Sequence, residues 1–366
     1  MTSQEPELLA MAATPVGTEE WSKWSSLPGD LVRRIADSLL ASNDLDQYMC
    51  LRAVCTYWRS ATDDPKDNAS DLRFQPRRWI IIDEVFQTEG KLLLLNTDTG
   101  RFLHKKLSLL REYYVVATTP SGFVVLADKS PPHAARVFNP LTGALTRFVA
   151  PVPPEVGVAQ VGCDEDEFYL YFLSDSSRKL RMLMVSSLET VSKEFLSGVL
   201  AGDVANSNIR FRCYVVGLAA QVFLHIEREG RTPILFKMNA EIGKIEPVES
   251  VGTFAIFAGY HRCLTVDADT FSGIDANCVY YTQHSGSSVH ICKYNLKDKR
   301  VERLSEVAEF VKQDKQFVLV AARPFTIIQL LCSYTMNRMD SQLSLQQMVW
   351  GTDQSRSNSV DGDLDD

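Results

Sequence analysis

Five turn signals spaced about 50 residues apart most strongly limit what this chain can fold into. Each begins with a polar residue after an apolar run, and a turn-closing residue follows four positions later. They are Asn96–Gly100, Asn139–Gly143, Ser186–Thr190, Asn239–Gly243 and Asn295–Lys299. Asn and Gly readily adopt the backbone conformations that tight hairpins need. A period of roughly 40 to 50 residues is typical of one blade of a β-propeller.

Short runs rich in Val, Ile, Phe and Tyr lie between these turns. Nine of them cover residues 79–82, 91–95, 113–117, 122–126, 168–173, 211–216, 222–226, 279–282 and 289–294. Runs of this length and composition between turn signals predict β-strands. We therefore expect a mainly β fold, with a propeller over residues 77–345 that has about six blades, within a range of five to seven. The apolar stretch 317–334 contains Arg323 and Pro324, and we interpret it as buried strands.

Residues 24–62 have a different pattern, which predicts three short helices. Pro28 is favoured in a first helical turn, and the apolar residues Leu31, Ile35 and Leu39 then recur every four positions. We expect a second helix from about Leu45 to Ala53 and a short third helical turn that carries Cys55 and Trp58. A segment of about 40 residues buries too little apolar surface to be stable alone. Some of its apolar side chains must therefore dock on another surface.

The other segments are polar. We expect residues 1–23 to be disordered, residues 63–76 to form a linker rich in Asp, Pro and Asn, and residues 346–366 to form a disordered acidic tail.

Charge and composition exclude several classes of partner. The net charge is −8 and the chain has no sustained run of Lys and Arg, which does not favour binding to nucleic acid or to an acidic membrane surface. The N-terminus lacks the basic start and apolar core of a secretory signal. The eight cysteines include no C-x-x-C pair, so we expect reduced thiols in the cytoplasm or the nucleus.

No arrangement of polar residues predicts catalysis. The six histidines show no metal-ligand spacing, and the chain contains no phosphate-binding glycine motif. The acidic run at 163–168 is typical of a solvated hairpin, and residues 284–286 lack the G-x-S-x-G pattern of a nucleophile. We expect no catalytic residue, no metal and no cofactor.

The helical segment resembles the F-box motif. The matching residues are Leu27, Pro28, Leu31, Ile35, Leu39, Arg52, Val54, Cys55, Trp58 and Arg59. In that family the F-box docks on a Skp-type adaptor, which connects it to a cullin and the ubiquitin-conjugating machinery. The resemblance implies an adaptor-binding surface made by Leu27, Pro28, Leu31, Ile35, Leu39, Leu51, Val54, Cys55 and Trp58.

The rest of the chain resembles a plant F-box subfamily with a C-terminal β-propeller, the group that includes the KIB proteins. The matching stretches are 117–128, 135–145, 251–283 and 293–304. Within the third stretch, the resemblance rests on Gly252, Phe257, Gly259, Gly273, Asn277, Val279 and Tyr280. Two positions depart from the family pattern, because Phe123 replaces a usual Trp and Ser272 replaces a usual Pro.

Together the resemblances imply a non-catalytic substrate receptor of a Skp–cullin–F-box ubiquitin ligase, which holds a client protein on the propeller. Two alternatives are open. One is an F-box scaffold that binds the adaptor but delivers no client for degradation. The other is a propeller hydrolase, which would need Asp, Glu, His or Asn side chains from several blades to converge on one metal.

Overall fold

The computed structural model describes most of the chain between residues 26 and 343. The described residues are 26–83, 91–153, 156, 158–164, 167–176, 179–185, 190–195, 209–215, 222–228, 234–239, 244–259, 262–285, 288–304, 310–313, 316–319, 326–336 and 341–343. The segments 1–23 and 346–366, which we expect to be disordered, lie outside them.

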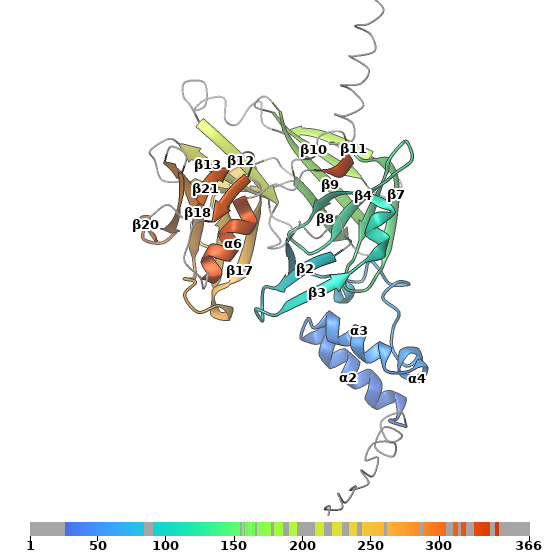
Figure 1. Ribbon diagram of the computed structural model, residues 1–366. Coiled ribbons are helices and arrows are strands. Elements are labelled where there is room, and N and C mark those ends of the chain that lie inside the picture. The colour runs from blue at the N-terminus through green and yellow to red at the C-terminus, as the bar shows by residue number, and fades with distance from the viewer. Residues whose placement is uncertain are drawn as a thin grey trace, which may run out of the picture.

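Three helices form an N-terminal helical unit, at the positions that the sequence predicts. They are α2 (Gly29–Ala41), α3 (Leu45–Ala53) and α4 (Thr56–Ser60), and the 3-10 helix η1 (Leu72–Phe74) follows. Asn43 has a positive φ of 55° between α2 and α3, a conformation that Asn adopts more easily than most residues. The Asp44 side chain then caps α3 by accepting a hydrogen bond from the Gln47 backbone N–H at 3.4 Å. Figure 1 shows the unit beside β2 and β3.

Strands dominate the rest of the described chain. Sheet 1 contains β1 (Trp79–Asp83), β2 (Lys91–Asn96) and β3 (Phe102–Lys106), and sheet 2 contains β4 (Tyr113–Thr118), β5 (Val124–Asp128), β6 (Ala134–Phe138) and β7 (Leu145–Pro151). Sheet 3 contains β8 (Val158–Asp164), β9 (Glu167–Ser176), β10 (Lys179–Val185) and β11 (Thr190–Phe195). Sheet 4 contains β12 (Ile209–Val215), β13 (Val222–Arg228), β14 (Ile234–Asn239) and β15 (Lys244–Pro247). Sheets 2, 3 and 4 are antiparallel meanders of four strands, which is the form of a propeller blade.

Sheet 5 has a different topology. It contains β16 (Phe254–Ala258), β17 (Cys263–Asp267), β18 (Cys278–Ser285), β19 (Ser288–Asn295), β20 (Arg300–Arg303), β21 (Phe310–Gln313) and β22 (Gln316–Leu319). β16 pairs with β18 in parallel, whereas the other pairs are antiparallel. Each of the nine predicted strand runs overlaps an observed strand, which confirms a mainly β, propeller-like fold. The described residues form five sheets, and the number of about six blades stays a prediction.

Three of the predicted turns lie within the described residues, in sheets 1, 2 and 5. Each connects two antiparallel strands that follow one another in the chain, as at β2–β3, β6–β7 and β19–β20. In the first, the Asn96 Oδ1 accepts hydrogen bonds from the backbone N–H groups of Asp98 and Thr99, and Gly100 has a φ of 68°. The Oδ1 atoms of Asn139 and Asn295 accept two backbone N–H groups in the same way. Residues 186–189 and 240–243 of the other two turns lie outside the described residues.

Sheet 1 packs on different neighbours with its two faces. Trp79 and Ile81 share a core with the helical unit and sheet 2, whereas Ile80 shares a core with sheet 5. This alternation follows from the two-residue period of a strand. Another core joins sheets 2 and 3. The first and last sheets of the chain are therefore neighbours, as blades are in a propeller.

One prediction about the C-terminal region is wrong. Part of the stretch 317–334 forms a helix, α6 (Ile327–Met336), although β22 does precede it as a strand. Leu331 and Met336 are fully buried against sheets 1 and 5. A helix that is covered on most sides shows little polar periodicity, so its sequence looks like that of a buried strand.

Gly259 explains how α6 packs so closely. A Cβ atom on Gly259 would lie 2.2 Å from the Thr335 carbonyl oxygen, so only glycine fits there. The Arg262 backbone N–H also donates to the Thr335 carbonyl oxygen at 3.2 Å. These contacts hold the end of α6 against the connection between β16 and β17.

Candidate protein-docking face

Helix α2 carries two apolar stripes, and its own chain covers only one of them. Val32, Ala36 and Leu40 are buried and form part of a core. Leu31 and Ile35 remain 37% and 41% exposed. Because successive helical residues turn by about 100°, these two flank the buried stripe on one side.

A second group of exposed apolar side chains comes from the end of α3 and from α4. Val54 is 54% exposed and Tyr57 is 47% exposed. Tyr57 lies next to the start of α2, because its hydroxyl is 3.1 Å from the position that a Cβ of Gly29 would take. Pro28 is also exposed there. We call Pro28, Leu31, Ile35, Val54 and Tyr57 the docking face.

The structure divides the nine adaptor-binding residues predicted from the sequence into three groups. Pro28, Leu31, Ile35 and Val54 are exposed, Leu27, Leu39 and Cys55 are partly buried, and Leu51 and Trp58 are buried. The buried and partly buried residues pack in the core beneath the helical unit. They support the docking face from inside. Tyr57, in α4, was missed, because the motif positions used for the prediction pass from Cys55 directly to Trp58.

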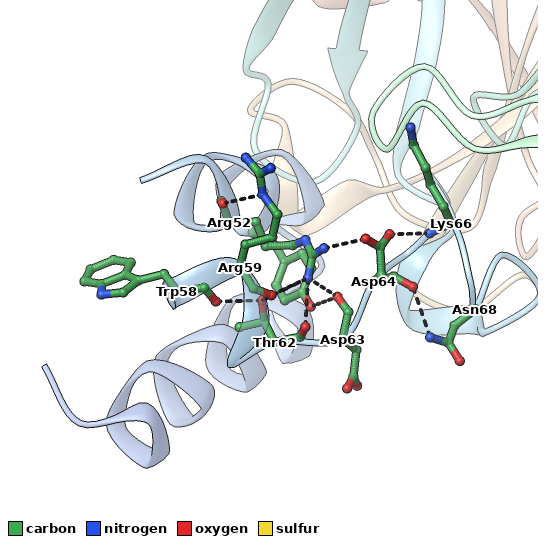
Figure 2. Close-up of polar contacts among 9 residues, drawn as sticks. Arg52, Trp58, Arg59, Thr62, Asp63, Asp64, Lys66 and Asn68 are labelled. Atoms are coloured by element: carbon green, nitrogen blue, oxygen red, sulfur yellow. Dashed lines mark hydrogen bonds and ion pairs between the residues drawn. The ribbon is translucent and has the colours of Figure 1, made fainter. Parts of the chain in front are cut away.

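Arg52 holds the helical unit together from its centre. The residue is 5% exposed. Its guanidinium donates to the backbone carbonyl oxygens of Arg59 at 3.2 Å and Thr62 at 2.8 Å, and its other amino group contacts the Asp64 carboxylate at 2.7 Å. The Arg59 side chain returns a hydrogen bond to the Arg52 carbonyl oxygen. Figure 2 shows Arg52 between α3 and the residues after α4. A buried guanidinium needs such partners, because an unpaired buried charge is costly.

The segment 63–76, which we expect to be a linker, makes specific contacts along its length. Asp64 caps the following turn by accepting the Lys66 backbone N–H at 2.9 Å (Figure 2). Phe74 is 1% exposed, and its ring centroid lies 5.6 Å from that of Tyr48 on α3. The Tyr48 hydroxyl donates to the Asp63 carbonyl oxygen at 2.8 Å. The segment therefore packs on the helical unit at one end and in the shared core at the other.

Electrostatic effects near the segment follow from these contacts. Burial raises the pKa of Tyr48, and the nearby Arg52 cation opposes that rise. The hydrogen bond from the Arg73 side chain lowers the pKa of Asp71 below its usual range. Both shifts stabilise the protonation states that neutral pH already favours.

The described residues contain no group of three or more His, Cys, Asp and Glu side chains that could hold a metal ion. Six cysteines described there are free thiols, and Cys263, Cys278, Cys292 and Cys332 among them are buried. Burial raises the pKa of Cys263, which keeps it protonated. Within the described part of the chain, no helix is long and apolar enough to cross a membrane.

The fold and the docking face together define a propeller-like β protein with an N-terminal helical unit. Residues 158–301 match a family model described as KIB1-4 beta-propeller. The matched range contains residues 252–280, on which the resemblance to the KIB-type propeller rests. Within it the Phe257 and Tyr280 rings stack at 4.7 Å between neighbouring strands, and the Asn277 side chain accepts the Val251 backbone N–H at 2.8 Å. A propeller domain of this kind suggests protein–protein interaction.

Other comparisons add little. The WD40 domain of SCAP from fission yeast has 13% identity and a TM-score of 0.29, over 65% of this chain and 56% of that one. A puromycin-hydrolyzing peptidase from Mycobacterium tuberculosis has 13% identity and a TM-score of 0.26, over 62% and 43%. The propeller domain of the Trilobed protease from Pyrococcus furiosus has 10% identity and a TM-score of 0.25, over 60% and 81%. This chain thus spans less than two thirds of the length of the first two proteins. TM-scores of 0.29 or less do not support any conclusion about function. The comparison with curated proteins found no match.

Proposed function

We propose that the chain is a substrate-receptor subunit of a Skp–cullin–F-box ubiquitin ligase. The helical unit is its F-box and binds a Skp-type adaptor, while the propeller binds a client protein. The chain performs no chemistry itself. It raises the effective concentration of client lysines near activated ubiquitin.

One observation carries this proposal: the docking face is apolar, exposed and held on a well-packed support. Leu31 and Ile35 lie beside a fully buried stripe on the same helix, so their exposure does not come from loose packing of α2. Clusters of exposed apolar side chains mark protein-binding surfaces. The agreement of this face with the exposed positions of the F-box motif supports a Skp-type adaptor as the partner.

The packing of sheet 2 favours one end of the propeller for the client. In an antiparallel meander, the β4–β5 and β6–β7 turns lie at the same end. The segment 63–76 covers that end, because Asn139 donates its side-chain N–H to the Phe74 carbonyl oxygen at 2.8 Å. A Cβ on Gly122 would lie 2.9 Å from the Pro76 carbonyl oxygen. The β5–β6 turn, residues 129–133, lies at the opposite end, which we propose as the client-binding end.

The decisive experiment measures binding of a purified Skp-type adaptor to the full chain. Leu31→Ala combined with Ile35→Ala should lower the affinity by about 100-fold or more, because each buried aliphatic side chain contributes about 1.5–3 kcal/mol. Arg33→Ala with Asp37→Ala is the matched control, since both residues are exposed on the polar side of α2. The control should bind normally. Equal adaptor binding by all three proteins would contradict the assignment of the docking face.

A cellular experiment separates a substrate receptor from a scaffold. Client abundance should rise when the gene is deleted, or when the Leu31→Ala/Ile35→Ala chain replaces the normal one. If client abundance does not change under either condition while the adaptor still binds the normal chain, the scaffold alternative is correct.

A further inference from the structure

We propose that Asp46, Arg101 and Lys105 are positioning residues, which hold the docking face at one fixed orientation relative to the propeller. We call these three side chains the ionic clamp. The inference goes beyond the proposed function, because it concerns how the helical unit is oriented on the propeller. It does not depend on which protein the docking face binds.

The first observation is the geometry of the clamp. Asp46, in the first turn of α3, is 6% exposed although it is charged. Its carboxylate contacts the Lys105 ammonium at 3.2 Å and the Arg101 guanidinium at 3.5 Å. Lys105 belongs to β3, and Arg101 immediately precedes that strand. One acidic side chain of the helical unit is thus bound by two cations of sheet 1.

Arg101 is itself held in place by two further contacts. It pairs with the Asp44 carboxylate at 2.9 Å, and its guanidinium lies over the Trp79 ring at 5.2 Å from the centroid. A planar guanidinium that stacks on a ring and pairs with carboxylates has little freedom to move. Its direction therefore sets where the start of α3 lies on sheet 1.

The second observation is the core beneath the clamp. Leu45 and Tyr48 of α3 pack in the same cluster as Trp79 and Leu94 of sheet 1. Apolar contacts supply the attraction between the two parts, but they are weakly directional. A buried ion pair adds little net stability, because desolvation offsets much of its Coulombic gain, whereas it can specify a single geometry. We assign the core to holding the parts together and the clamp to orienting them.

Spin labels on exposed residues of the two parts test this assignment. Bioorthogonal labels at position 38 on α2 and position 149 on β7 report the distance between the helical unit and sheet 2 in the full chain. Ser38 and Val149 are both exposed, so the labels should not disturb the core. We expect a single narrow distance distribution in the normal chain.

Two variants remove the clamp without removing the core. In the first, Asp46→Leu, Arg101→Met and Lys105→Met replace the charges by apolar side chains, so the melting temperature should stay the same or rise while the distribution loses its single narrow peak. Asp46→Asn is a near-isosteric change that should also broaden the distance distribution. It tests the positioning role if the triple variant does not fold. Asp37→Ala, an exposed carboxylate on α2, is the matched control and should leave the narrow peak unchanged.

The outcomes are clear in both directions. A narrow peak that persists in the clamp variants, or a broad distribution in the normal chain, would overturn the positioning role. A structural role alone would change the melting temperature and leave the peak narrow. Adaptor affinity is measured on the same proteins. If none of them binds the adaptor, the proposed function is contradicted, while the distances between the spin labels still test the positioning role of the clamp.

Discussion

Helices α2 and α6 are both rich in aliphatic residues, yet the protein covers them in opposite ways. Leu331 and Met336 of α6 are fully buried between sheets 1 and 5. On α2, Val32 is equally buried, while its neighbour Leu31 remains 37% exposed. The comparison shows that apolar content does not decide coverage. The chain buries most of the second half of α6 and leaves one side of α2 open, and an open apolar side is the arrangement expected of a helix that receives a partner.

The largest expected difference between the two helices comes from removing one leucine side chain from each. Leu331→Ala should lower the free energy of unfolding by about 2–5 kcal/mol, because it leaves a cavity in a closed core. Leu31→Ala should lower it by less than about 1 kcal/mol, since that side chain already contacts solvent. Chemical denaturation of the two variants measures both values. Equal losses would mean that α2 is covered as completely as α6, which would undermine the comparison.

A smaller effect is expected at Arg52, which stabilises the helical unit but lies far from α6 in the sequence. Arg52→Gln removes charge-assisted hydrogen bonds to the residues after α4 and should cost about 2–3 kcal/mol. Hydrogen exchange should become faster in α3 and α4 while α6 keeps its protection. Arg33→Gln, an exposed change on α2, is the control and should leave both helices protected. Loss of protection in α6 as well would show that the two regions unfold as one.

The smallest effect is expected at Tyr280, in the core that covers α6. The Tyr280 hydroxyl accepts the Asp275 backbone N–H at 2.8 Å, so Tyr280→Phe should cost about 1 kcal/mol. Burial is the main cause that raises the pKa of Tyr280 to about 12. In the unfolded chain, Tyr280 ionises at the ordinary tyrosine pKa. The stability that the folded state gains from the neutral Tyr280 side chain is therefore complete below that value and is lost as the pH rises towards about 12.

The pH dependence of unfolding checks this sign. Above the ordinary tyrosine pKa, the normal chain should lose stability with rising pH more steeply than Tyr280→Phe. Parallel curves for the two proteins would mean that Tyr280 is less enclosed than the structure shows. The difference in burial between α6 and α2 would then be smaller than we describe.

Much of the fold could be predicted from local signals. Helix α3 begins and ends at the residues that the pattern predicts, because the break at 42–44 and its cap are formed by neighbouring residues. The turns at Asn96, Asn139 and Asn295 were found for the same reason, since each Asn side chain binds backbone N–H groups two and three residues ahead. Helix α6 was misread, because burial on most sides removes the polar positions that reveal a helical period.

The candidate site could be predicted only in part. The sequence placed Leu31, Ile35 and Val54 together with Leu51 and Trp58 in one surface, but the last two are buried. It contained no sign of the ionic clamp either, because Asp46 and Lys105 are distant in the chain and meet only when sheet 1 packs on α3.

The amino-acid sequence by itself determined where the three N-terminal helices, nine of the strand runs and the hairpin turns at Asn96, Asn139 and Asn295 form, since those depend on residues within a few positions of one another. Only the tertiary structure decided that Val32 is enclosed and Leu31 is open, and that Asp46 lies between two cations. The physical reason is that coverage and charge pairing depend on surfaces contributed by distant segments. Their relative placement results from packing of the whole chain.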